Sequence, residues 1–245
     1  MPLQGDLNWR YIPAIATTGA LQMAIDTWLW HHSDRPCLRF YTWEPAAISL
    51  GYHQRQFPAS WRSLGWQGQP LSLVRRPTGG RAVLHQGDLT YSIVVWGLGR
   101  SRHHLYRQLC QFLLKGWEAL GYSLAFGHAA LSAYGEQPVN CFATATAADI
   151  TLLSGEKIIG SAQGWRGDRV LQHGSILLQP NRDLWQQVFG CAPHSLALPP
   201  PERVQDALLS AFAEQWHVTL TPEPLTHAEW QDVKRIATLV AGQTL

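Results

Sequence analysis

Charge is scarce in this 245-residue chain, and lysine is scarcer still. Asp, Glu, Lys and Arg together make up 15% of the residues, and the formal net charge is only +2. So small a charge predicts neither nucleic acid nor a membrane surface as a partner. Of the 19 basic residues, only Lys115, Lys157 and Lys234 are lysines.

Long apolar runs are also missing. No segment approaches the roughly 18 apolar residues that a membrane-spanning helix needs. The N-terminal stretch MPLQGDLNWRYIPA has an acid near its start and no apolar core, so it does not resemble a secretory signal. We therefore expect a cytoplasmic protein.

Paired cysteines are absent as well. Cys37, Cys110, Cys141 and Cys191 include no C-x-x-C pair, so their spacing predicts neither a zinc site nor a disulfide framework. Cys110 lies in an amphipathic helical pattern and Cys37 opens a strand-like segment, so both are expected to be structural. No metal and no cofactor is expected.

What the chain does have is a large apolar share, 46% of its residues, which is enough for a sizeable core. Apolar periodicity predicts a mixed α/β fold without repeats. Strands are predicted at 37–43, 46–51, 71–74, 89–95 and 170–178, with a hairpin over 150–163. Helices are predicted near 20–31, from Ser101 to Gly121, around 204–212 and after the capping box that begins at Thr226.

One loop interrupts this pattern. The segment RRPTGGRAVLHQGDLTYS, residues 75–92, places arginines and a Gly-Gly pair between two strands. Glycine backbone can approach a ligand closely, and the arginines Arg75, Arg76 and Arg81 supply positive charge, so the loop suits an anion or a carbonyl oxygen. Taken alone, an ordinary β-turn with solvated arginines explains the same residues equally well.

The loop belongs to an ordered series of motifs. LRFYTWEPAAISLGYHQ, RRPTGGRAVLHQGDLTYS, NCF, GEKIIGSAQ and LQHGSILL follow one another over residues 38–178, after the helix ALQMAID. In this order they resemble the biotin/lipoate protein ligase catalytic-domain superfamily, in particular its cysteine-dependent octanoyltransferases. The resemblance implies a mixed β-sheet flanked by helices, similar to class II aminoacyl-tRNA synthetases and biotin ligases, with the arginine-glycine loop lining an acyl tunnel.

The distribution of proline suggests a domain organisation. The Pro-rich segment 195–202 is the one plausible internal boundary, because proline continues neither a helix nor a sheet ladder. We expect residues 1–195 to form the catalytic domain. Residues 196–245 are expected to form a helical extension packed on that same domain.

Two departures distinguish the subfamilies. ATP-dependent lipoate ligases have the motif R-R-x-x-G-G-G, and here Arg81 stands in place of its third glycine. The ligase motif H-D-x-G-N is also missing, because His85 begins the sequence HQGDL. Both favour the transferase. Cys141, in VNCF, matches the transferase nucleophile. The chain departs from the transferases too, since ATATAADI follows Phe142 where the family has a Pro-Ser turn and an aromatic residue.

The chemistry of a thioester explains why Cys141 and Lys157 would work together. A second thioester on the enzyme keeps an acyl group reactive without ATP. The thiol must lose its proton, and a nearby cation favours the thiolate. The resemblance places Lys157 opposite the cysteine, although a lysine after a hairpin turn is also an ordinary solvated residue. We expect an exposed or pocket-facing side chain, so that Lys157→Met keeps the fold.

The remaining site residues are implied by the same motifs. Backbone amides of the glycine loop could hold an oxyanion, and small residues on the following strand could let an acyl chain pass. The two histidines are wall residues, proton carriers or structural side chains. The substrate-binding candidates are Arg76, Thr78, Gly79, Gly80, Arg81, His85, Gly160, Ser161, Ala162 and His173.

Three functions remain open at this point. The leading one is octanoyl transfer from acyl carrier protein to a lysine of a lipoyl domain, in a 2-oxoacid dehydrogenase or the glycine cleavage H protein. The second is an ATP-dependent lipoate ligase or a lipoyl amidotransferase. The third is a non-catalytic module that binds an acyl group or its carrier. Such a module would need neither Cys141 nor Lys157.

Overall fold

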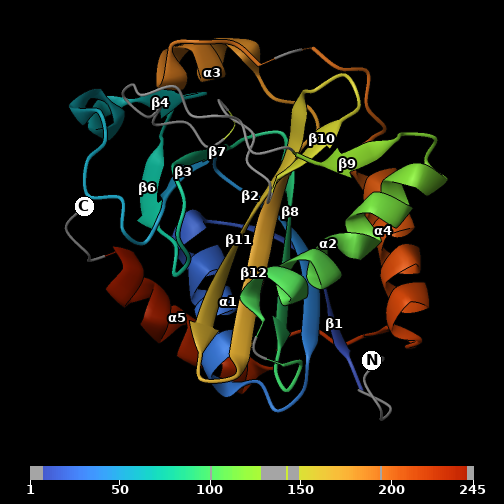
Figure 1. The fold of residues 1–245 in the computed structure, drawn as a ribbon. Helices are drawn as coiled ribbons and strands as arrows, with labels where there is room; N and C mark the ends of the chain where they lie inside the picture. The colour runs from blue at the N-terminus through green and yellow to red at the C-terminus, as the bar shows by residue number, and fades with distance from the viewer. Residues whose placement is uncertain (1–7, 100, 128–141, 143–148, 194, 242–245) are drawn as a thin grey trace.

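The computed structural model describes residues 8–99, 101–127, 142, 149–193 and 195–241. Within these residues the largest element is an eight-stranded mixed sheet (Figure 1). Its strands, from one edge to the other, are β13 (Thr221–Pro222), β1 (Arg10–Thr17), β2 (Cys37–Trp43), β8 (Asp88–Val95), β12 (Arg169–Leu177), β11 (Lys157–Arg166), β10 (Ile150–Leu152) and β9 (Leu124–Phe126).

The direction of the strands changes across this sheet. The first three, β13, β1 and β2, run parallel to one another, and every later pair is antiparallel. The central strand β8 is buried over its whole length. A strand buried on both faces is typical of a sheet that helices cover on each side.

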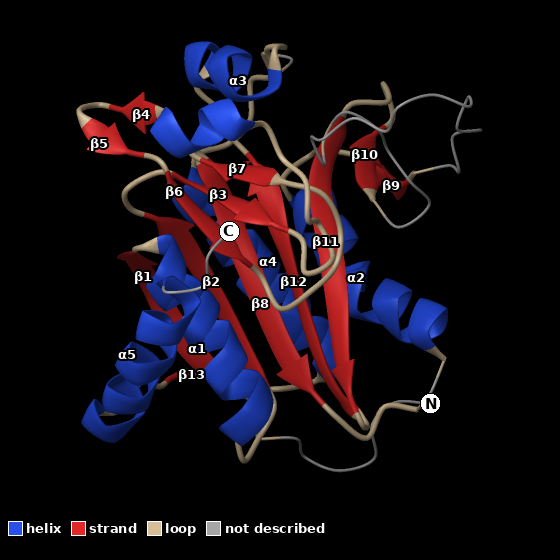
Figure 2. Ribbon diagram, turned by 90° about the vertical axis from the view of Figure 1, so that its left-hand side faces the viewer, coloured by secondary structure: helices blue, strands red, loops and turns tan. Residues whose placement is uncertain are grey.

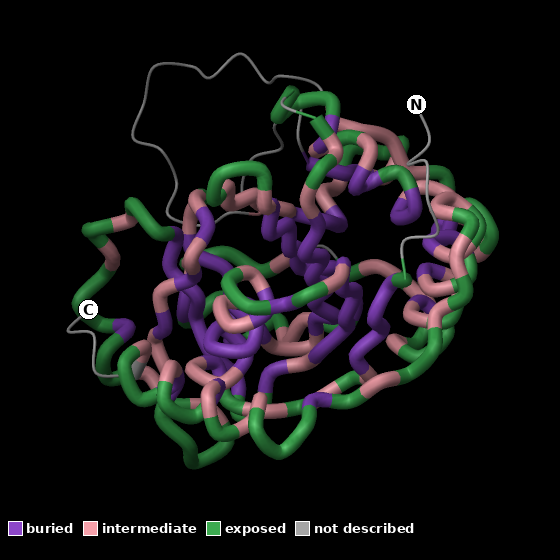
Figure 3. The backbone as a smooth tube through the Cα atoms, turned by 90° about the horizontal axis from the view of Figure 1, so that it is seen from below, coloured by how far each residue is buried: buried purple, intermediate pink, exposed green. Residues whose placement is uncertain are grey.

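Two pairs of helices provide that cover. Figures 1 and 2 show α2 (Arg102–Ala119) and α4 (Pro201–Trp216) on one face of the sheet, and α1 (Gly19–His32) and α5 (His227–Ala241) on the other. The face under α2 and α4 holds the larger apolar cluster, which includes Phe40, Tyr91, Phe112 and Phe212. Figure 3 shows the buried backbone gathered in the interior and exposed loops around it.

A smaller sheet lies beside the α1 face. It consists of β6 (Ser72–Arg75), β3 (Ala47–Leu50) and β7 (Val83–His85), in that order. A two-stranded ribbon of β4 (Gly65–Trp66) and β5 (Gln69–Pro70), the short helix η1 (Ala59–Ser63) and α3 (Arg182–Phe189) surround it. Its own apolar cluster includes Ile48, Leu50, Leu84 and Trp185.

Local sequence signals explain where the helices begin. The hydroxyl of Thr18 accepts a hydrogen bond from the N–H of Leu21 at the start of α1. The backbone N–H of Thr226 donates to the Glu229 carboxylate at 2.7 Å, and the Glu229 N–H donates back to the Thr226 hydroxyl at 3.3 Å, which is the predicted capping box. These side chains satisfy N–H groups that a helix leaves unpaired in its first turn.

The predicted fold class, a mixed sheet flanked by helices, is confirmed. The predicted helices near 20–31, from Ser101 and after Thr226 are present, as is the hairpin of β10 and β11. Missing from the prediction were the strands β1, β4, β5, β7, β9 and β13 and the helices η1 and α3. Strand β1 contains Pro13, which breaks the alternation, and its pairing with β2 shifts register between Ile12 and Ile15.

The C-terminal residues are part of the same packing. Helix α4 packs on α2, α5 packs on α1, and β13 extends the main sheet beside β1. The buried guanidinium of Arg10 in β1 also pairs with the Glu229 carboxylate of α5 at 2.6 Å. The boundary expected at residue 195 stays a prediction. No helix in the described parts of the chain has both the length and the apolar character to span a membrane.

Candidate active site

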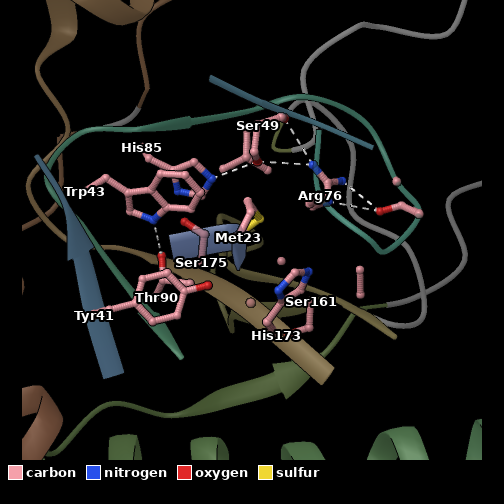
Figure 4. Close-up of a pocket in the computed structure, with 16 residues that line it drawn as sticks. Met23, Tyr41, Trp43, Ser49, Arg76, His85, Thr90, Ser161, His173 and Ser175 are labelled. Carbon is pink, nitrogen blue, oxygen red and sulfur yellow. Dashed lines mark hydrogen bonds between the residues drawn. The ribbon is translucent and has the colours of Figure 1, made fainter. Parts of the chain in front are cut away.

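A pocket lies between the main sheet, α1 and the smaller sheet. Its lining combines apolar and aromatic side chains with a few polar groups, as small-molecule sites commonly do. Figure 4 shows Trp43 and Tyr41 at one end and Arg76 and Ser161 at the other. The lining residues are Met23, Tyr41, Trp43, Ser49, Arg76, Gly79, Gly80, Val83, His85, Thr90, Gly160, Ser161, Ala162, His173, Gly174 and Ser175.

The register of the main sheet builds one wall of the pocket. Tyr41 is paired with Thr90, Thr90 with Ser175, and Ser175 with Gly160, so the four form one row across β2, β8, β12 and β11. Residues directly opposite one another point to the same face of a sheet. The row ends on glycine at β11, which leaves space at the side where that strand passes.

The arginine-glycine loop forms the opposite wall, and Arg76 holds it in shape. The Arg76 guanidinium donates to the carbonyl oxygens of Gly79 and Arg81, both at 2.8 Å, and to that of Ser49 at 3.1 Å. A Cβ at Gly51 would lie 1.7 Å from the Gly80 carbonyl oxygen, so only glycine fits there. The predicted positive charge of Arg76 thus stabilises the backbone of the loop.

The neighbouring arginines have different places. Arg75 donates to the carbonyl oxygens of Gly51 and Gln54 at 2.9 and 2.7 Å and is not among the residues that line the pocket. Arg81 is not among the residues that line the pocket. The two predicted glycines, Gly79 and Gly80, do line it.

His173 lies in a buried chain of polar groups. Its Nδ1 is 2.8 Å from the Asp26 carboxylate, and its Nε2 bonds the hydroxyl of Thr78 in the loop. The Tyr41 hydroxyl donates to the Asp26 carboxylate at 2.9 Å, and the Arg39 guanidinium lies 3.5 Å from the same carboxylate. Although burial opposes ionisation, the adjacent Arg39 and the hydrogen bonds hold the pKa of Asp26 below its ordinary value. The network ties the loop to helix α1.

His85 has a comparable environment at the other end of the pocket. Its Nδ1 is 2.8 Å from the Asp88 carboxylate, and its Nε2 is 2.8 Å from the Ser49 hydroxyl. The Trp43 indole stacks on its ring at 3.7 Å and donates to the Thr90 hydroxyl at 2.9 Å. Burial lowers the pKa of His85, so this imidazole is neutral at pH 7.

Lys157 begins β11, the strand that supplies the small residues of the pocket. Its side chain is only 4% exposed, and its Nζ is 2.9 Å from the Asp149 carboxylate. It also lies 5.1 Å from the centre of the Phe142 ring. The expectation of an exposed side chain is therefore wrong, because β11 and its neighbours bury the ammonium beside a carboxylate. That the side chain faces the pocket stays a prediction. Cys141 lies outside the described residues.

The structure brings most of the predicted binding residues together. Gly160, Ser161 and Ala162 line the pocket with both histidines, and Thr78 reaches it through His173. Sequence reasoning missed Trp43, Ser49, Thr90 and Ser175 in the lining and the two carboxylates behind it, Asp26 and Asp88. It also missed Asp149 beside Lys157. Alternation places residues on a face of a strand, but nothing in the sequence indicated that these faces meet.

In the described part of the chain, the other thiols and possible metal ligands do not form a site. Burial raises the pKa of Cys37 to about 11 and that of Cys110 to about 12, in agreement with their predicted structural role. Cys191 is exposed. Among the described residues, no group of three His, Cys, Asp or Glu side chains is arranged to bind a metal ion.

Comparison with known proteins points to one family. The lipoyl protein ligase A/B catalytic domain matches residues 18–212. A protein of Brevibacillus brevis named octanoyltransferase LipM is 35% identical over 221 residues, which cover 85% of this chain and 76% of that protein. The protein of the same name from Bacillus subtilis is 33% identical, with coverage of 84% and 75%.

Solved structures share the fold at lower identity. A lipoate-protein ligase A bound with ATP superposes with a TM-score of 0.77 at 21% identity, and 96% of each chain is covered. A bipartite lipoate protein ligase of Thermoplasma acidophilum, studied with its E2 lipoyl domain, gives a TM-score of 0.72 at 19% identity, covering 96% of this chain and 93% of the other.

Proposed function

We propose that this chain moves an octanoyl group from acyl carrier protein to a lipoyl-domain lysine. The chain belongs to the lipoyl protein ligase A/B catalytic-domain family and is an acyltransferase. The octanoyl group would be carried in between as a thioester on Cys141. The curated relatives are named octanoyltransferases, as the motif order at residues 38–178 predicts.

The width of the sheet at the pocket supports an eight-carbon acyl group. The row from Gly160 to Tyr41 crosses three strand spacings of about 4.8 Å, which is about 14 Å. An extended eight-carbon chain, with seven C–C bonds of about 1.5 Å in a zigzag, is about 9 Å long. The row of lining residues is therefore longer than such a chain, which supports an acyl group lying across these strands.

The observation that carries the proposal is the position of Phe142. Phe142 follows the proposed nucleophile directly in the sequence, and its ring lies 5.1 Å from the Lys157 ammonium. Three residues after Lys157 the same strand supplies Gly160 to the pocket. This arrangement supports a thiol near a buried cation at the acyl pocket, which is what a thiolate nucleophile needs.

The proposed reaction has two balanced steps. In the first, the Cys141 thiolate attacks the thioester carbonyl carbon and the bond from that carbon to the carrier sulfur breaks. The carrier leaves as a thiolate and takes up a proton. In the second, a neutral lysine amine of the lipoyl domain attacks the Cys141 thioester. An amide forms, the amine loses its proton, and the Cys141 thiol is released. The Lys157 ammonium would favour the thiolate in both steps.

The decisive experiment omits nucleotide. The protein is incubated with octanoyl-acyl carrier protein without ATP, and its intact mass is measured before and after an apo lipoyl domain is added. We expect one octanoyl adduct that hydroxylamine removes and the lipoyl domain collects. Cys141→Ala should form none, and Cys191→Ala serves as the matched control with full activity.

Several results would contradict the proposal. Octanoylation that requires ATP and free octanoate would replace the transferase with a ligase. An adduct mapped to Cys191, or full turnover by Cys141→Ala, would exclude Cys141 as the carrier of the acyl group. Transfer from a lipoylated protein, but not from the carrier thioester, would identify an amidotransferase.

A further inference from the structure

The turn between β7 and β8 reads His85-Gln86-Gly87-Asp88, and it folds the carboxylate back onto the histidine. Gly87 has a φ of +70°, and a Cβ there would lie 2.0 Å from the Gln179 carbonyl oxygen, so this turn needs glycine. Gln86 accepts a hydrogen bond from the backbone N–H of Asn181 at 2.6 Å. The conformation of this turn therefore fixes the position of the Asp88 side chain.

The Asp88 side chain is 1% exposed, and one of its oxygens is a shared acceptor. That oxygen, Oδ2, lies 2.8 Å from Nδ1 of His85, 2.7 Å from the Ser175 hydroxyl and 3.2 Å from the Thr90 hydroxyl. His85, Ser175 and Thr90 all line the pocket, whereas Asp88 itself does not. The carboxylate thus lies behind the wall and contacts three of its members.

Two of these contacts continue to further wall residues. The Trp43 indole donates to the Thr90 hydroxyl and stacks on the His85 ring. Both contacts of Trp43 are therefore with residues that are hydrogen-bonded to Asp88. In the other direction His85 contacts Ser49, whose hydroxyl accepts from Arg76 at 3.3 Å. Figure 4 shows this series of side chains along one side of the pocket.

The direction of each hydrogen bond follows from the donors available. A carboxylate only accepts, so Nδ1 of His85 carries the hydrogen that points to Asp88. Nε2 is then an acceptor for the Ser49 O–H, and the Ser49 oxygen accepts from Arg76. Every donor in the series has an acceptor in this single arrangement.

We propose that Asp88 is a positioning residue for acyl binding, holding His85, Thr90 and Ser175, and through them Trp43, in the arrangement that keeps the pocket open. This rests on the proposed acyl-transfer function. The residue touches no substrate; it acts through the wall. Binding to a preformed wall lowers the energies of the bound substrate and of the transition state alike, so a loss of Asp88 should appear in KM.

The test compares three substitutions at one position. Asp88→Ala removes the shared acceptor, and we expect KM for octanoyl-acyl carrier protein to rise about tenfold or more, since a misfit of one methylene in an apolar pocket is worth about 10–200-fold. We expect kcat to stay within about threefold. Asp88→Asn retains an oxygen that can accept the same three hydrogen bonds, so it should restore KM. Asp88→Leu fills the space without an acceptor and replaces Asp88→Ala where that variant does not fold.

A spectroscopic readout separates positioning from general destabilisation. Long-range ¹H–¹⁵N spectra report which imidazole nitrogen carries the hydrogen, and the wild type should show His85 as the Nδ1–H tautomer. Asp88→Ala should lose that signature, and His85→Gln assigns the signal. Glu229→Ala is the matched control, because it removes a part-buried carboxylate paired with Arg10 at 2.6 Å, on β1 and away from the pocket. It should leave KM and the tautomer unchanged.

The outcomes are distinct. An unchanged KM in a folded Asp88→Ala protein would overturn the inference, as would an Asp88→Asn variant as impaired as Asp88→Ala. If the wild type transfers no octanoyl group at all, the proposed function fails instead. Calorimetric titration with octanoate then decides the inference: wild type must bind octanoate and Asp88→Ala must bind it about tenfold more weakly, and equal binding or none would refute it.

Discussion

Replacing Lys157 with Met should reduce the stability of this protein as well as its activity. The Lys157 ammonium lies 2.9 Å from the Asp149 carboxylate, and the two side chains are only 4% and 7% exposed. Met has a similar length but no charge, so the substitution leaves the carboxylate buried without that cation. An ionised carboxylate in such a place is much less favourable than in water.

The size of the effect follows from burial. Removing one partner of a buried ion pair costs about 3–5 kcal/mol. For a chain of this length each kcal/mol lowers the unfolding temperature by about 2–4 °C, so Tm should fall by roughly 6–20 °C. The double variant Lys157→Met/Asp149→Asn removes both charges and should recover most of this loss, to within about 2 kcal/mol of wild type.

The assay is urea unfolding followed by tryptophan fluorescence at pH 7.5. The matched control is Lys115→Met, because the Lys115 and Glu214 side chains are 3.9 Å apart and 42% and 76% exposed. Such an exposed pair contributes about 0–1 kcal/mol. Octanoyl transfer should be lost in the single and the double variant alike, which separates the chemical role of Lys157 from its structural one.

Two results would refute this reasoning. A Lys157→Met protein as stable as the Lys115→Met control would show that the Asp149 charge needs no buried cation. A double variant as unstable as the single one would show that the loss comes from packing and not from charge.

Three further predictions concern the loop, the thiols and pH. Gly51→Ala should abolish transfer and lower stability by about 3 kcal/mol or more, because its Cβ would lie 1.7 Å from a loop carbonyl oxygen. Gly79→Ala has nothing within 4 Å of its Cβ and should lower stability by less than about 1 kcal/mol. Thermal unfolding measures both variants, and equal losses of stability would contradict the geometry. Cys37 and Cys110, with pKa values raised by burial to about 11 and about 12, should resist iodoacetamide at pH 8 until urea unfolds the chain; peptide mapping of native protein should find neither modified. Burial lowers the pKa of His85, so the unfolded chain binds a proton that the folded chain does not, and stability should fall as pH drops below about 6.5. Urea unfolding at pH 7.5 and 5.5 measures this fall in stability, and His85→Gln should weaken it. An identical fall in the wild type and in His85→Gln would contradict this prediction.

The sequence by itself determined the elements whose signals are local. The alternation in 89–95 and the strand-like segment 170–178 predict strands that the structure contains as β8 and β12. The capping box at Thr226 places the start of α5, because its hydrogen bonds join residues three apart. The ordered motifs also predicted the family, since each motif is a short stretch of chain. Pairing Cys141 with Lys157 remains a prediction from the same motifs.

Only the tertiary structure decided how these stretches meet. Asp26 and His173 are 147 positions apart in sequence and lie 2.8 Å apart, because α1 packs on the face of the sheet to which β12 contributes. The row from Tyr41 to Gly160 depends on the register of four strands, and no periodicity within one strand specifies its neighbours. The structure likewise showed that Lys157, expected to be exposed or to face the pocket, is buried and paired with Asp149. Exposure depends on all the elements packed around a side chain and not on its own sequence neighbours.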